Sequence, residues 1–138
     1  MRRFLLIDTA AEPSAIALAT ARKVLAESTV TNRKRLSEEL LARIDTLCGE
    51  SSTPLKELSA IGIVSGPGPF TALRIGTAVA NALGYAHKLP LVPVGGDEVP
   101  SLPAFAKLVA EKLDKRETVG AVLPNYGREP SITPPKKK

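Results

Sequence analysis

The sequence predicts an α/β fold, with a mixed five-stranded sheet and three helices in a single domain. Two observations lead to this prediction. The first part of the chain holds three short strand-like segments joined by tight turns, which is the pattern of an antiparallel meander. The rest alternates between helical stretches and short apolar runs, and this alternation is typical of strands connected through helices. A length of 138 residues fits one domain.

The meander occupies the first thirty residues. Its strands are expected over Arg3 to Thr9, Ala15 to Thr20 and Val24 to Val30. The turns at residues 11–14 and 21–23 are short enough to keep neighbouring strands antiparallel.

An amphipathic helix is expected to follow. Its apolar residues recur at the three-and-four spacing of one helix face, and they are Leu36, Leu40, Leu41, Ile44, Leu47 and Cys48. Gly49 comes next as the expected C-terminal cap. Cys48 is the single cysteine, and its place in the apolar stripe indicates a packed hydrophobic residue more than a reactive thiol.

The remaining elements alternate along the chain. A short helical turn opens at Thr53 and Pro54, and a buried strand is expected over Ala60 to Val64. The second long helix ends near Ala86, a strand covers Leu91 to Val94, and a final helix runs from Ser101 to Arg116. With 43% hydrophobic residues and no Trp, the core is expected to be mostly aliphatic.

The turn before the second long helix consists of Gly and Pro. Gly66 and Gly68 allow positive φ and close backbone approach, while Pro67 stiffens the turn and Pro69 suits the first helical position. One interpretation is a rigid connection that aims the helix. The other is an anion-binding turn made by Gly66, Gly68 and Arg74, because free N–H groups at a helix N-terminus favour negative charge.

Four stretches together resemble the TsaB (YeaZ) family. The run GPGPFTALRIG at residues 66–76 is similar to the family's GPGSFTGLRIG. LLIDT at residues 5–9 resembles its opening strand, RLSEELLARID at 35–45 its first long helix, and LPNYGR at 123–128 its closing Pro-x-Tyr-x-Arg motif.

The sequence also departs from the family pattern. Pro69 replaces a usual Ser, Ala72 a usual Gly, Ala10 a common Ser, and Asn32-Arg33 a common His-Ser pair. Each change removes a polar side chain or flexibility near the turn. Only residues 100–119 separate the first lobe from the closing motif, so the family's second lobe is expected to be largely absent.

The resemblance implies a ribonuclease-H-like lobe of the actin/Hsp70/sugar-kinase superfamily. It implies a non-catalytic subunit of the assembly that places a threonylcarbamoyl group on N6 of adenosine 37 in certain tRNAs. The implied partner is TsaD, which would supply the metal, the nucleotide site and the transfer chemistry, with the TsaE ATPase as a further partner. The chain itself would need no cofactor or metal, would contact tRNA only indirectly, and would form a homodimer in isolation.

A ridge of small residues marks the second long helix. Ala72, Gly76, Ala80 and Gly84 recur every four residues, and such a ridge allows close approach of another element. That element is either the chain's own sheet or a partner helix. The family is implied to use its two long helices in a bundle, so the expected partner interface comprises Leu36, Leu40, Arg43, Ala72, Leu73, Gly76, Ala80, Leu83 and Gly84.

An enzymatic function is the alternative, as a minimal nucleotide-binding or peptidase-like protein that uses Asp8, Thr9 and the turn. A homodimer without TsaD is a third possibility. His87 is the only histidine, which excludes a His-based metal cluster. A Ser-His-Asp set would need Ser65, His87 and Asp8, and the expected layout places them apart. No catalytic or metal-ligating residue is therefore assigned.

The net charge of +5 is concentrated in the tail, where Lys136 to Lys138 supply three positive charges. Residues 1–120 are expected to form the lobe with its final helix, and residues 121–138 a C-terminal segment with a disordered basic tail. The cluster at residues 33–35 is interpreted as a solvated helix face, with contact to RNA or an acidic partner as the open alternative. A cytoplasmic location is expected, because Asp8 interrupts the apolar run that follows Arg3.

Overall fold

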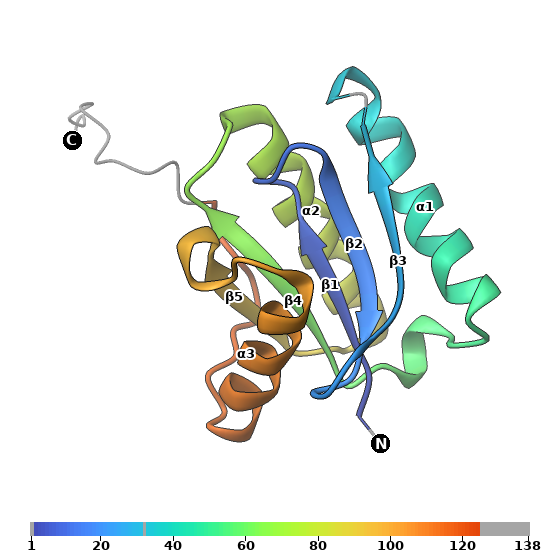
Figure 1. Cartoon of the computed structure of the whole chain (residues 1–138), viewed down its shortest axis with the longest axis vertical. Helices are drawn as coiled ribbons and strands as arrows, with labels where there is room; N and C mark the ends of the chain where they lie inside the picture. The colour runs from blue at the N-terminus through green and yellow to red at the C-terminus, as the bar shows by residue number, and fades with distance from the viewer. Residues whose placement is uncertain (1, 32, 125–138) are drawn as a thin grey trace.

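A mixed five-stranded sheet lies at the centre of the protein (Figure 1). The computed structural model describes residues 2–31 and 33–124. The strands lie in the order β3-β2-β1-β4-β5. Their bounds are β1 Phe4–Asp8, β2 Ser14–Ala19, β3 Val24–Val30, β4 Ala60–Gly66 and β5 Leu91–Gly95.

The central strand β1 joins the antiparallel and parallel parts of the sheet. It pairs antiparallel with β2 and parallel with β4, so that Phe4 lies opposite both Ala19 and Ala60. β2 and β3 are antiparallel, and β4 and β5 are parallel. Short turns allow the first arrangement, whereas helical crossovers produce the second. The C-terminal ends of β1, β4 and β5 therefore lie at one edge of the sheet.

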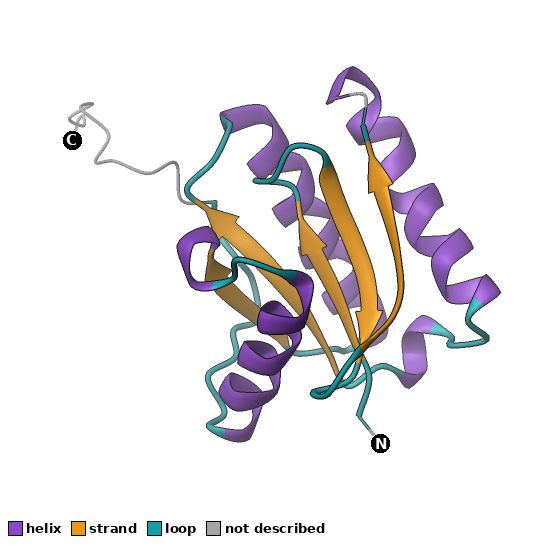
Figure 2. Cartoon of the chain, in the orientation of Figure 1, coloured by secondary structure: helices purple, strands orange, loops and turns teal. Residues whose placement is uncertain are grey.

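Three helices cover the two faces of the sheet, as the sequence predicts. The helices α1 and α2 lie on one face, and α3 lies on the other (Figure 2). None of the helices in the described part of the chain is long and apolar enough to cross a bilayer. Their bounds are α1 Leu36–Glu50, α2 Phe70–His87 and α3 Leu102–Asp114, with 3-10 turns at η1 Arg33–Arg35, η2 Leu55–Glu57 and η3 Gly96–Glu98.

Two aliphatic layers make the core. Side chains alternate between the faces along a strand, so Leu5 and Ile7 face α1 and α2 while Phe4 and Leu6 face α3. All four are fully buried. Val109 of α3 completes the second layer. The predicted fold class is confirmed.

Two helix ends differ from the prediction. Gly49 does not cap α1, because the helix continues through Glu50 and the left-handed residue is Ser52, with φ of 51°. The Thr53 N–H then closes the turn by donating to the carbonyl of Cys48 at 2.9 Å. Pro69 is the N-cap of α2, with extended backbone, and not its first helical residue.

The segment after α3 packs back onto the lobe. Val119 forms an isolated antiparallel bridge with Leu91 of β5. Val122 lies two residues beyond the expected lobe boundary at 120, yet it is buried at 4% exposure. Its N–H donates to Asn81 Oδ1 at 2.7 Å, and its carbonyl accepts from Asn81 Nδ2 at 3.0 Å. Most of the closing motif and the basic tail, residues 125–138, lie outside the described residues.

Candidate functional site

The turn between β4 and α2 packs tightly against the loop after β1. Gly66 has φ of 135°, which side chains disfavour. A Cβ on Gly68 would lie 2.9 Å from the Cβ of Ala10, so only glycine fits there without displacement. The start of α2 is thus fixed against the end of β1.

Asp8 ends β1 beside this turn. Its carboxylate accepts hydrogen bonds from the N–H groups of Ala10 and Ala11, both at 3.0 Å. Burial raises the pKa of Asp8, and these two hydrogen bonds oppose that rise. The Asp8 carboxylate therefore stabilises the loop that follows β1.

The expected anion-binding turn involves Gly66, Gly68 and Arg74. Pro69 provides no side-chain cap for the first turn of α2. Arg74 is exposed, and its guanidinium carbon lies 5.3 Å from the ring centroid of Phe70. Anion binding at this turn stays a prediction.

The ridge of small residues on α2 faces inward. Ala72 and Ala80 are buried at 1% and 0% exposure, and Gly76 and Gly84 are buried as well. A Cβ on Gly76 would overlap Thr9 Oγ1, and one on Gly84 would lie 2.7 Å from Leu91 Cδ2. The expectation that this ridge meets a partner helix is therefore corrected, because Thr9, directly after β1, and Leu91 of β5 occupy the space.

The apolar members of the expected interface are also buried. Leu36, Leu40, Leu73 and Leu83 belong to the core between the sheet and the two helices. They are unavailable to a partner for the same reason as the ridge: they fill the space above the strands. Arg43 alone is exposed, and its guanidinium lies 3.4 Å from Glu39.

The opposite side of α2 carries an exposed apolar surface that the sequence reasoning missed. We call it the α2 outer face, and it consists of Phe70, Arg74, Ala78, Ala82 and Tyr85. Phe70 is 56% exposed and Tyr85 is 89% exposed. A shallow groove of about 310 Å³ runs along it, lined by Thr71, Arg74, Ile75 and Ala78. The signal was present in the sequence, because these residues also recur at helical spacing.

Comparisons with known proteins match this chain to proteins named TsaD and TsaB. A family model described as TsaD, tRNA N6-adenosine threonylcarbamoyltransferase, matches residues 23–99, more than half of the chain. The TsaB protein of Haemophilus influenzae is 29% identical over 123 residues, covering 86% of this chain and 48% of that protein. The Escherichia coli TsaB protein is 33% identical over 92 residues, covering 67% and 39%. The chain belongs to the TsaB (YeaZ) family.

Solved structures agree with the TsaB assignment. YeaZ from Pseudomonas aeruginosa superposes with a TM-score of 0.63 at 28% identity, over 69% of this chain and 44% of that one. RuvC of T. thermophilus gives a TM-score of 0.60 at 10% identity, over 86% and 98%, which supports the ribonuclease-H-like fold alone. This TsaB-family chain spans about half, or less, of the length of the curated relatives it matches.

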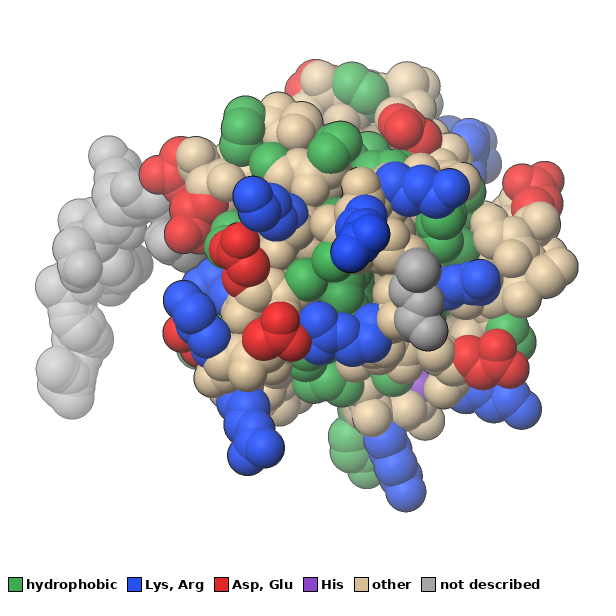
Figure 3. Space-filling model, turned by 60° about the horizontal axis from the view of Figure 1, so that its bottom comes forward, with side chains coloured by type: hydrophobic (Ala, Val, Ile, Leu, Met, Phe, Trp, Pro, Cys, Tyr) green, Lys and Arg blue, Asp and Glu red, His purple; other side chains and the backbone are tan. Residues whose placement is uncertain are grey.

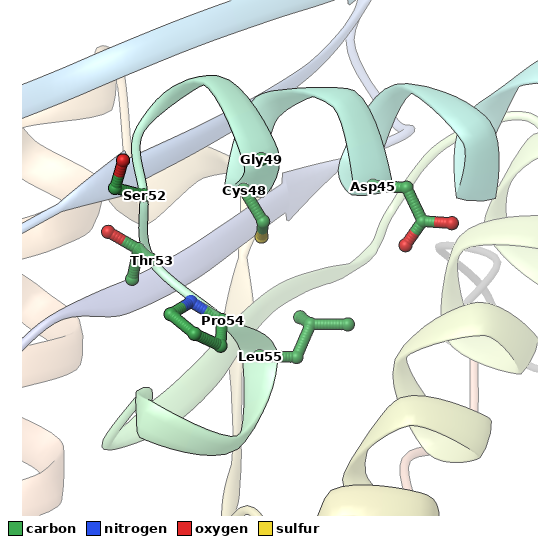
Figure 4. Close-up of a pocket in the computed structure, with 7 residues that line it drawn as sticks. All are labelled: Asp45, Cys48, Gly49, Ser52, Thr53, Pro54 and Leu55. Carbon is green, nitrogen blue, oxygen red and sulfur yellow. The ribbon is translucent and has the colours of Figure 1, made fainter.

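A second hollow in this TsaB-family chain lies between the end of α1 and η2. Its volume is about 340 Å³, and the Cys48 thiol points into it between Pro54 and Leu55 (Figure 4). Burial, and then the nearby Asp45 carboxylate, raise the pKa of Cys48. Both effects favour the protonated thiol, and Cys48 is buried, as its place in the apolar stripe predicts.

Asp8, Thr9 and the turn, which the alternative enzyme would use, lie together in the TsaB lobe, whereas the Ser-His-Asp set does not converge. Asp8 lies at the C-terminal end of β1, whereas His87 lies at the far end of α2. The Ser65 hydroxyl donates to the carbonyl of Val94 at 3.4 Å. Among residues 2–31 and 33–124, no three His, Cys, Asp or Glu side chains group into a metal site.

Proposed function

We propose that this protein is a non-catalytic subunit that binds a TsaD protein and supports its transfer of a threonylcarbamoyl group to N6 of adenosine 37 in tRNA. Involvement in the biosynthesis of this modified nucleoside follows from its TsaB relatives. A relative named as the transferase itself, from Persephonella marina, is 27% identical over 124 residues. The observation that carries the proposed role is the exposed, nearly uncharged α2 outer face.

The α2 outer face has the composition of a helix-packing surface. Ala78 and Ala82 are small enough to let a second helix approach closely, and Phe70 and Tyr85 flank them as large anchors. A fully exposed aromatic side chain offers roughly 150–250 Å² for burial, at about 25 cal/mol per Å². Tyr85 offers most of this area, and Phe70 about half of it. A solvated helix face would carry more charge than the single Arg74.

The division of labour with TsaD is supported by the chemistry of the lobe. The Asp8 carboxylate is held by backbone N–H groups, and His87 lies at the opposite end of the molecule. A general acid and base must both reach the reacting atoms, and these two groups do not share a site. We therefore assign the metal, the nucleotide and the transfer step to TsaD, and place the TsaE ATPase as a further partner of the assembly.

The test is complex formation with the TsaD protein from the same source, followed by light scattering. Ala78→Arg places a long cation in the middle of the α2 outer face. It should weaken the complex about tenfold or more, because a buried unpaired charge is costly at an interface. Ala21→Arg, in the exposed turn between β2 and β3, is the matched control and should bind TsaD like the unchanged chain.

Three outcomes would overturn the proposal. If the protein forms only a homodimer and never binds TsaD, the face serves self-association. If Ala78→Arg leaves TsaD binding intact, the interface lies elsewhere. Turnover of ATP above a boiled control, abolished by Asp8→Ala, would favour the minimal enzyme.

A further inference from the structure

One end of the molecule gathers nine of the fifteen Lys and Arg residues in the described part of the chain. At this end β1, β4 and β5 begin, the β2–β3 turn lies beside them, and α1, α2 and α3 finish. Figure 3 shows blue side chains across the middle of this face. We call it the basic end, and it consists of Arg2, Arg3, Arg22, Lys23, Lys56, Lys88, Lys112, Lys115 and Arg116.

Few of these charges are neutralised locally. Arg2 pairs with Asp114 at 2.8 Å, and Lys112 pairs with Glu117 at 3.4 Å. Nine cations and six acids lie at this end, the other four acids being Glu27, Glu50, Glu57 and Glu111. The remaining exposed cations make no ion pair within the described residues, and they are Arg22, Lys23, Lys56, Lys88, Lys115 and Arg116.

The opposite end has a different charge balance. Asp8, Glu12, Asp97 and Glu98 lie there, at or just beyond the C-terminal ends of the parallel strands or in the loop after β1. Lys34, Arg35 and Arg74 also lie at that end, and Arg35 is paired with Glu39 at 2.7 Å. The protein therefore presents a positive potential in one direction, and such a field steers a polyanion toward one face.

The backbone of the β2–β3 turn, which carries two of the unpaired cations, is held by Thr20. Thr20 is buried at 4% exposure, and its hydroxyl accepts from the N–H groups of Arg22 and Lys23 at 3.2 and 3.3 Å. A hollow of about 140 Å³ lies between Arg2 and Arg22, with the Phe4 side chain in its wall. The Arg2 guanidinium is already paired with Asp114, so Arg22 is the unpaired cation beside this hollow.

We propose that the basic end binds the phosphate backbone of tRNA directly. The cations come from separate elements spread over a whole end of the protein, which suits an extended polyanion and not a single small anion. The choice of tRNA among polyanions rests on the proposed function. Contacts of this kind position a nucleic acid without reading its bases.

The experiment measures binding of the full chain to unmodified, fluorescently labelled tRNA by anisotropy, at several salt concentrations. One variant combines Arg22→Gln, Lys23→Gln and Lys115→Gln. The matched control combines Lys34→Gln, Arg35→Gln and Lys107→Gln, which removes the same charge away from the basic end. Each lost phosphate contact should reduce the magnitude of the slope of log K against log salt by about one, so the slope of the first variant should fall by up to about three. This variant should also bind tRNA roughly tenfold more weakly at low salt.

The control variant should keep the slope and the affinity of the unchanged chain. Equal losses in both variants, or a larger loss in the control, would overturn the proposal and favour the cluster at residues 33–35. Binding to phosphatidylglycerol vesicles without binding to tRNA would also overturn it. TsaD binding is measured separately by light scattering, so a failed complex refutes the proposed function while the tRNA titration still tests the basic end.

Discussion

Thr9 and Gly76 show at the scale of single residues how closely α2 packs on the sheet. Thr9 is fully buried, and its Oγ1 has no hydrogen-bond partner within the described residues. The side chain lies where a Cβ on Gly76 would be. An unpaired buried hydroxyl costs free energy, so the close packing of α2 on β1 must offset it.

The space around each glycine predicts opposite effects on stability for Gly76→Ala and Gly49→Ala. Gly76→Ala should lower the free energy of unfolding by roughly 1–3 kcal/mol, because its Cβ overlaps Thr9. Gly49→Ala, whose Cβ would meet nothing within 4 Å, should raise it by about 0.5–1 kcal/mol through helix propensity. Urea denaturation measures both. Adding Thr9→Ala to Gly76→Ala should recover part of the loss, and no recovery would contradict the overlap.

Asp8 predicts a pH dependence of stability. Burial raises the pKa of Asp8, so the folded protein holds this proton more tightly than the unfolded chain. Its contribution to stability is therefore present below the ordinary carboxyl pKa of about 4 and is lost as the pH rises through the raised value. Asp8→Asn keeps an acceptor for Ala10 and Ala11 and removes the charge.

We expect Asp8→Asn to equal the unchanged chain near the acid end of a denaturation series and to exceed it in stability at neutral pH. The unfolding free energies of the two proteins, measured at the same pH values, give the difference directly. A variant that is less stable at neutral pH would mean that the hydrogen bonds to the carboxylate outweigh its burial.

At the scale of elements, the two sides of α2 have different surroundings. Its inner side carries Gly76 and Gly84 against β1 and β5, and its outer side carries Phe70 and Tyr85 in solvent. Asn81 lies between these sides and fastens Val122 to the helix. The C-terminal segment is therefore held by Asn81 of α2 and by the bridge between Val119 and Leu91.

The Asn81 contact can be broken alone. Asn81→Ala leaves the N–H and carbonyl of the buried Val122 unpaired, which should cost roughly 1–3 kcal/mol and release the segment. The amide of Val119, which donates to Leu91 at 2.9 Å, should then exchange its hydrogen faster. Leu123→Ala, at an 84% exposed position, is the control and should change neither stability nor exchange. Unchanged exchange in Asn81→Ala would show that the bridge to β5 holds the segment by itself.

At the scale of the whole molecule, the order of the strands separates two surfaces. The helices α1 and α2 share one face of the sheet, which leaves the α2 outer face available to a partner. The parallel strands all begin at one end, so the turns and helix ends that carry Arg22, Lys56 and Lys115 meet there. A protein partner and a nucleic acid are thus proposed for different parts of the lobe.

The sequence by itself determined the fold class, the element order and the family. The spacing of apolar residues was enough to predict the elements, because the apolar stripe of α1 and the run Ala60 to Val64 indicate which residues are buried. The Gly and Pro residues before α2 likewise predict a tight turn, because their backbone preferences are local. The burial of Cys48 followed from the same spacing.

Only the tertiary structure decided which side of α2 is free. A stripe of small residues fits equally well against the chain's own sheet and against a partner. The choice depends on two contacts outside α2: Thr9, which is far from Gly76 in the sequence, packs against it, and Leu91 of β5 packs against Gly84. Asn81 and Val122 are 41 residues apart, and nothing in their local sequence predicts their contact. The basic end likewise exists only after folding, because topology brings together cations that are scattered along the chain.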